Sequence, residues 1–215
     1  MSPKSPRAPV TRSEQKAATQ RQLLEAARRC FERQGYAGTA IGDIAREAGV
    51  AHGTFYVHFE SREAVADVLL QGFNDNLSRA LVPLLTADHG SLEATVREAA
   101  KLFLVALDDD RALVRFYAER AASGLPPDAL ATGINPPALA ALTEALVARA
   151  GDGDGDRVDL AAHGLLALWL RVGLRYALLG RTSRKTAEDV LVQLTTGALS
   201  ALLTVNPRPR GARTR

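Results

Sequence analysis

The stretch from Gly35 to Phe59 constrains the fold of this chain more than any other segment. Apolar residues recur at helical spacing between Ile41 and Ala48, which predicts a short amphipathic helix. Gly49 follows this segment, and glycine adopts the left-handed backbone that a tight turn requires. Val50 is expected to fill the angle between this helix and a second short one, from His52 to Phe59. Two short helices joined in this way form a helix-turn-helix.

The second of these helices is the candidate recognition helix, because its N-terminal residues face base edges when such a motif enters the major groove. Gly53 has no side chain, so the backbone there is able to approach DNA closely. Phe55 and Phe59 are four residues apart and are expected to pack inward. Tyr56 and His58 point elsewhere and carry donors suited to phosphate oxygens.

The rest of the chain also has helical patterns, and no segment alternates apolar and polar residues as a half-buried strand does. The first helix is expected from Ala17 to Gln34, with Leu23, Leu24, Ala27, Cys30 and Phe31 on one face. The further helices are expected at about 62–85, 92–107, 108–122, 136–150, 157–179 and 186–204. The predicted fold class is therefore all-α.

The N-terminal pattern resembles the DNA-binding head of TetR-family regulators. The matching residues occur in the family's order and cover about a quarter of the chain: Leu23, Leu24, Ala27, Phe31, Gly35, Tyr36, Thr39, Ile44, Ala45, Ala48, Gly49, Val50, Gly53, Thr54, Phe55, Tyr56, His58, Phe59, Ser61, Arg62, Glu63 and Ala64. The resemblance implies a three-helix helix-turn-helix head on a larger helical body that binds a ligand and dimerises.

The resemblance also assigns candidate DNA contacts: Thr39, His52, Gly53, Thr54, Tyr56 and His58. The chain departs from the family pattern at Ala40 and Ala51, where a Thr and a Ser are common. Those hydroxyls would cap the two short helices or reach phosphate. Val57 stands where the family often has a polar or aromatic residue, and a valine is suited to contact with a thymine methyl group.

Charge is distributed unevenly along the chain. Residues 1–60 contain nine Lys/Arg and six Asp/Glu, residues 61–206 contain fourteen and eighteen, and residues 207–215 contain four Arg and no acid. We expect four regions: a disordered basic arm at 1–16, a DNA-binding domain at 17–60, an effector-binding and dimerisation domain at 61–206, and a disordered basic tail at 207–215. Basic ends favour an acidic partner such as DNA, although such tails also simply increase solubility.

Two helices of the body are rich in apolar residues on several sides, and such helices must be covered by other elements. We expect residues of about 157–205 to pair across a two-fold axis as a four-helix bundle, so that the homodimer binds an inverted repeat. The family resemblance also implies a pocket in the body for a small, largely apolar effector that releases the DNA. The residues proposed to line it are Phe103, Phe116, Tyr117, Arg120, Trp169 and Tyr176.

Several other classes of protein find little support in the sequence. A single cysteine, Cys30, permits no internal disulfide and fits a cytoplasmic location. Residues 1–16 lack the apolar segment of a secretory signal, and no apolar run is long enough to span a bilayer. No catalytic, phosphate-binding or dinucleotide motif occurs, so we expect neither enzymatic activity nor a cofactor or metal. A DNA-binding dimer that responds to no ligand, and a helical enzyme without a recognisable motif, remain as alternatives.

Overall fold

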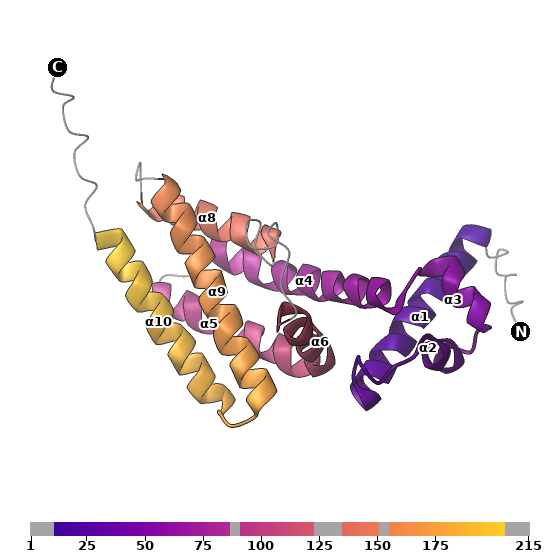
Figure 1. Ribbon diagram of the computed structural model, residues 1–215. Helices are drawn as coiled ribbons and strands as arrows, with labels where there is room; N and C mark the ends of the chain where they lie inside the picture. The colour runs from indigo at the N-terminus through magenta and orange to yellow at the C-terminus, as the bar shows by residue number, and fades with distance from the viewer. Residues whose placement is uncertain (1–10, 87–90, 123–134, 151–154, 205–215) are drawn as a thin grey trace, which may run out of the picture. The chain divides into compact units, whose positions relative to one another are not determined.

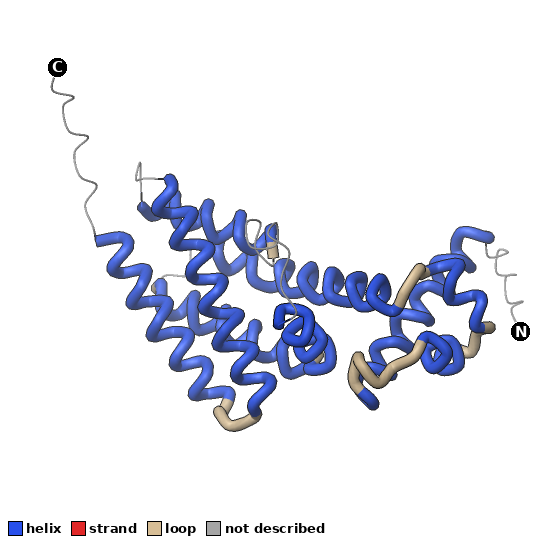
Figure 2. The backbone as a smooth tube through the Cα atoms, viewed as in Figure 1, coloured by secondary structure: helices blue, strands red, loops and turns tan. Residues whose placement is uncertain are grey.

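The computed structural model describes residues 11–86, 91–122, 135–150 and 155–204, and over these ranges the chain is helical with no strand (Figure 1, Figure 2). It divides into two compact units, residues 1–71 and residues 72–215. The first unit contains the helix-turn-helix and the second is a larger helical body. The predicted all-α fold class is therefore confirmed.

The N-terminal unit is built on α1 (Arg12–Gln34), α2 (Ile41–Ala48) and α3 (His52–His58). Helix α1 begins earlier than predicted, because Thr11 and Glu14 form a capping box. The Thr11 hydroxyl accepts from the Glu14 N–H at 3.2 Å, and the Glu14 carboxylate accepts from the Thr11 N–H at 2.7 Å. The prediction of a disordered arm reaching residue 16 was thus wrong for residues 12–16. Residues 1–10 lie outside the described part.

The body contains α5 (Leu92–Asp109), α6 (Arg111–Ala122), α8 (Pro136–Ala150), α9 (Gly155–Leu179) and α10 (Arg184–Thr204). Helix α4 (Arg62–Thr86) begins in the first unit and ends in the second. The break between α5 and α6 falls at Asp110, two residues later than predicted, and Asp108 belongs to α5. The tail at 207–215 lies outside the described residues.

The core of the body forms where α5 packs against both α9 and α10 (Figure 1). Gly173 on α9 makes this close packing possible: a Cβ atom there would lie 2.6 Å from Cε1 of Phe103 and 2.7 Å from Cδ1 of Leu107. A second apolar cluster joins α8, α9 and α10 around Leu146, Ala162 and Leu199. Apolar side chains on several sides of α9 are therefore used to contact α5, α8 and α10.

Asn135 connects α8 with α4 through buried polar contacts. Its side-chain oxygen accepts from the Ala138 N–H at 3.1 Å and from the Ser78 hydroxyl at 2.6 Å, so it caps α8 and holds α4 at once. Its amide nitrogen donates to the Asn74 carbonyl at 3.3 Å.

Among the described residues, none of the helices is long and apolar enough to cross a lipid bilayer.

Candidate nucleic-acid interface and ligand cavity

The turn between α2 and α3 has the geometry that the sequence predicts. Gly49 has φ +69° and ψ 28°, the left-handed conformation that a residue with a Cβ atom adopts only at a cost. Its N–H donates to the Arg46 carbonyl at 3.1 Å, and the Val50 N–H donates to the Ala45 carbonyl at 3.0 Å. These bonds satisfy the last carbonyls of α2 and direct the chain into α3.

The orientation of α3 is fixed by its two phenylalanines. Phe55 is fully buried and Phe59 nearly so, and their ring centroids lie 5.9 Å apart. Successive residues of an α-helix are turned by about 100°. Burial of this side therefore leaves His52, Gly53, Tyr56 and Val57 exposed on the rest of the helix, and we call these four residues the α3 face.

Three of the proposed DNA contacts belong to the α3 face. The His52 ring lies edge-on to the Tyr56 ring, with centroids 5.4 Å apart, and a Cβ on Gly42 of α2 would lie 3.8 Å from its Cδ2 atom. A Cβ on Gly53 would have no atom of the described residues within 4 Å, so none of these residues hinders close approach of another molecule. The Tyr56 side chain is 53% exposed.

Thr54 and His58 are only half exposed. The Thr54 N–H donates to the Ala51 carbonyl at 2.8 Å and so helps to begin α3. Nδ1 of His58 is buried and has no hydrogen-bond partner within the described part of the chain. Both side chains lie at the border of the α3 face.

Thr39 is placed differently from the prediction. Its side chain is only 1% exposed, and its hydroxyl donates to the Gly35 carbonyl at 2.8 Å. A hydroxyl used in this way fixes the loop between α1 and α2 and is not presented to a partner. The interpretation of Thr39 as a DNA contact was therefore wrong.

Arg62 holds this same loop, a role that the sequence reasoning missed. Its guanidinium donates to the carbonyls of Tyr36 at 3.0 Å and Thr39 at 2.7 Å, and it lies 4.2 Å from the centre of the Tyr36 ring. The Tyr36 hydroxyl donates to Glu63 at 2.6 Å, and this bond holds the pKa of the Glu63 carboxyl below its ordinary value. In the sequence, the only indication of this contact is that the TetR-family pattern has a basic residue at the position of Arg62.

Ion pairs join α1 to α2 beside the turn. Glu47 accepts from Arg29 at 2.8 Å and from Arg33 at 3.2 Å, and the Arg29 hydrogen bond is the main reason why the pKa of Glu47 lies below its ordinary value. Because the charges are exposed, each pair adds little stability. Their effect is to orient the two helices and to compensate part of the positive charge of α1.

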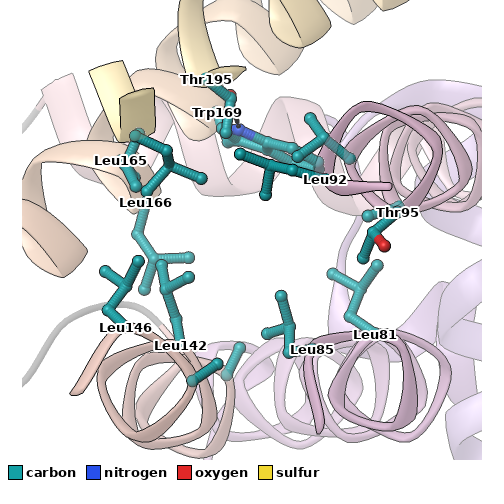
Figure 3. Close-up of a pocket in the computed structure, with 15 residues that line it drawn as sticks. Leu81, Leu85, Leu92, Thr95, Leu142, Leu146, Leu165, Leu166, Trp169 and Thr195 are labelled. Atoms are coloured by element: carbon teal, nitrogen blue, oxygen red, sulfur yellow. Dashed lines mark hydrogen bonds between the residues drawn. The ribbon is translucent and has the colours of Figure 1, made fainter. Parts of the chain in front are cut away.

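A cavity of about 90 Å³ lies inside the body, between α4, α5, α8, α9 and α10 (Figure 3). Its walls are mostly aliphatic side chains. The fifteen lining residues are Leu81, Leu85, Leu92, Thr95, Val96, Ala99, Ala138, Leu142, Ala145, Leu146, Leu165, Leu166, Trp169, Thr195 and Leu199.

The few polar groups of the cavity wall already have partners. The Trp169 indole N–H donates to the Thr195 hydroxyl at 2.8 Å, and the Thr95 hydroxyl donates to the Ser91 carbonyl at 3.2 Å. None of the lining residues carries an ionisable side chain. The cavity therefore suits an uncharged, apolar molecule, because a buried charge would find no compensating group there.

Of the residues predicted to line a pocket, Trp169 does so and the others do not. Phe103 packs behind Trp169 with centroids 5.5 Å apart, Phe116 is buried elsewhere, and the Tyr176 hydroxyl donates to Asp108 at 2.7 Å. Tyr117 is half-buried, and burial raises the pKa of its hydroxyl. The Arg120 side chain lies outside the described residues. The other lining residues of this cavity were not predicted, because aliphatic residues of a cavity wall look like ordinary core in a sequence.

Helices α9 and α10 lie side by side and carry the exposed apolar residues on which the dimer prediction depends (Figure 1). Leu194 of α10 is 47% exposed, and Gly197, Ala198 and Ala201 lie on the same side of the helix and are also exposed. Leu178 of α9 is exposed as well. Small residues beside an exposed leucine allow another helix to approach closely.

Comparison with known sequences places the strongest similarity on the N-terminal unit. Residues 23–69 match the profile of the tetR family of bacterial regulatory proteins. The chain is 32% identical over 105 residues to the HTH-type transcriptional repressor KstR2 of Rhodococcus jostii, a match that covers 47% of this chain and 50% of KstR2. The chain thus spans about half the length of this curated relative.

Solved structures extend the similarity over most of the chain. A TetR-family regulator from Mesorhizobium loti is 25% identical, with a TM-score of 0.63 over 91% of this chain and 98% of the other. A tetR-family regulator from Streptomyces coelicolor, 17% identical, has a TM-score of 0.71 over 88% of this chain and 84% of the other, and it shares the fold. The N-terminal unit thus matches the tetR family of bacterial regulatory proteins, and the chain as a whole resembles solved TetR-family regulators.

Proposed function

We propose that the protein is a sequence-specific DNA-binding regulator of transcription, and not an enzyme, that acts in the cytoplasm. The observation that carries the proposal is the α3 face, which is turned outward by the burial of Phe55 and Phe59. A recognition helix needs such a face, with a bare backbone at Gly53 and polar groups at its edges. We assign base or phosphate contacts to His52, Gly53, Thr54, Tyr56 and His58.

We propose further that two copies pair through α9 and α10, within the predicted range of about 157–205. The exposed Leu194 and the small residues beside it support this pairing. Covering an exposed apolar helix face with a second copy removes apolar surface from water, and this stabilises the dimer. A two-fold dimer presents two copies of α3, so the operator is an inverted repeat with half-sites about 34–36 Å apart.

The cavity supports a response to a small apolar effector that releases the operator, and hence a role as a repressor, as KstR2 is named. Its volume of about 90 Å³ is below the roughly 150 Å³ of an engineered apolar cavity that binds benzene. An effector larger than benzene therefore has to move the aliphatic walls when it enters. Such a movement changes the equilibrium between DNA-binding and released forms only if the ligand binds one form more tightly.

Selection of bound sequences from random duplex DNA tests the DNA-binding proposal. We expect an inverted repeat among the selected sequences, and affinity that falls steeply with salt because phosphate contacts release counterions. Full-length protein that binds no duplex at low salt would contradict the proposal. Catalytic turnover without DNA affinity would favour the enzyme alternative.

The effector proposal has a direct optical test, because Trp169 is the only tryptophan of the chain and lies in the cavity wall. We expect its fluorescence to change on titration with 1-octanol and to remain unchanged with octanoate, which has the same chain length and a charged head. Operator release should follow the same titration. If a ligand binds and the DNA affinity stays unchanged, the result would support the alternative, a DNA-binding dimer that responds to no ligand.

A further inference from the structure

Val57 is the most exposed large apolar side chain among the described residues of the N-terminal unit, with 66% of its surface accessible. It follows Gly53 by one helical turn, so both lie on the side of α3 opposite Phe55 and Phe59. A β-branched residue in an exposed helical position is less favourable than alanine. Neither packing among the described residues nor helix propensity favours a valine here, and its exposed side chain is available to contact another molecule.

The side chains of α3 limit which bases this helix is able to recognise. Its seven residues include no Arg, Lys, Asn or Gln, the side chains that make bidentate hydrogen bonds to guanine or adenine. Among the groups that the four base pairs present in the major groove, the thymine methyl is the apolar one. An outward valine beside a bare glycine is complementary to that methyl group.

We propose that Val57 is a specificity-determining residue that contacts the methyl group of one thymine in each operator half-site. The inference depends on the proposed DNA-binding function and adds to it the identity of a base. Thr54 also has a methyl group, but its side chain is half-buried at the border of the α3 face. Val57 lies opposite the two buried phenylalanines and is fully on the exposed side.

Deoxyuridine substitution tests this contact, because it removes the thymine methyl and leaves the hydrogen-bonding groups of the base unchanged. Each thymine of a selected operator is replaced in turn, and the Kd of the full-length protein is measured. We expect one position in each half-site at which the replacement weakens binding about fourfold, the ratio that corresponds to about 0.8 kcal/mol for one buried methyl or methylene group.

Two variants assign the effect to a side chain. In Val57→Ala the same replacement should no longer change the Kd, whereas in Thr54→Ser, which loses a methyl but keeps its hydroxyl, the fourfold effect should persist. Val57→Ala exchanges an exposed residue for a better helix former, so loss of the fold does not confuse the result.

The possible outcomes separate this inference from the proposed function. If the protein binds its operator and every thymine tolerates the replacement, or if the effect persists in Val57→Ala, the inference is overturned and the DNA-binding proposal stands. A Val57→Ala variant with unchanged affinity for all operators would also overturn it. Failure to bind any DNA overturns the proposed function and this inference with it.

Discussion

Trp169 donates its indole N–H to the hydroxyl of Thr195 at 2.8 Å, and this bond joins α9 to α10 at the wall of the cavity. Thr195 is buried and Trp169 is partly buried. The same two helices carry the proposed dimer face. A ligand that displaces the Trp169 ring would therefore act on the contact between the two helices that we propose as the dimer interface.

Loss of that acceptor should destabilise the body. Thr195→Val keeps the shape of the side chain but leaves the Trp169 N–H unpaired, which typically costs about 1–3 kcal/mol. Chemical denaturation followed by Trp169 fluorescence measures the loss. Thr196→Val is the matched control, because the Thr196 hydroxyl is half-buried and donates to a carbonyl of its own helix, that of Val192 at 2.7 Å. Equal effects of the two variants would contradict the assigned role.

Two glycines of the head should respond oppositely to alanine. Gly49→Ala forces a Cβ into a left-handed conformation and should destabilise the unit by about 1–2 kcal/mol. Gly53→Ala introduces a better helix former into open space, so it should stabilise the unit by about 0.5–1 kcal/mol. Its DNA affinity should nevertheless fall, because the added methyl occupies the α3 face. Unchanged operator affinity in Gly53→Ala would contradict close backbone approach.

Arg62 should determine the order of the loop between α1 and α2. Arg62→Ala removes a charged donor from the carbonyls of Tyr36 and Thr39, and we expect a loss of about 1–3 kcal/mol. Arg62→Lys keeps the charge but not the planar group that donates to both carbonyls and stacks on Tyr36, so it should rescue only part of the loss. Amide hydrogen exchange of residues 36–40 measures the effect. Full rescue by lysine would indicate that charge alone matters.

Asp108 should make the stability of the body depend on pH. Burial by itself raises the pKa of this carboxyl, but hydrogen bonds from Tyr176, Arg111 and Arg184 outweigh it, and the pKa lies below its ordinary value of 3.8. A lowered folded-state pKa contributes stability that is fully present above the unfolded value and is lost as pH falls through the folded value.

We therefore expect Asp108→Asn to be less stable than the natural protein at neutral pH, with the difference shrinking below about pH 4. Denaturation curves at several pH values test this, with Asp109→Asn on the same helix turn as the control, since Asp109 is exposed. A difference between Asp108→Asn and the natural protein that stays constant down to acid pH would contradict the ion-pair account.

The dimer proposal predicts the effect of a charge on the exposed side of α10. Leu194→Glu should shift the protein from dimer to monomer in analytical ultracentrifugation, because two like charges would meet near the two-fold axis. Gln193→Glu, also exposed but polar in the natural chain, is the control and should remain dimeric. If Leu194→Glu forms the same dimer, the pairing surface lies elsewhere.

The sequence alone determined the helices and the motif, because these depend on local information. The spacing of apolar residues predicted α2, and the proline pair at 136–137 predicted the start of α8, both with the bounds that the structure has. Gly49 between two short helices predicted the turn. The side of α3 that is buried also followed from Phe55 and Phe59. A period of 3.6 residues and the conformational freedom of glycine are properties that can be read without knowledge of distant contacts.

The tertiary structure decided what each polar or aromatic side chain does. A threonine hydroxyl is suited to contact with a phosphate oxygen, yet in the folded loop the Thr39 hydroxyl is bonded to the Gly35 carbonyl. Tyr176 is an aromatic residue of the body like Trp169, but its hydroxyl is taken by Asp108, sixty-eight positions away. A cavity exists only where five helices fail to fill the space between them. That outcome depends on the packing of residues distant in sequence, which no local pattern records.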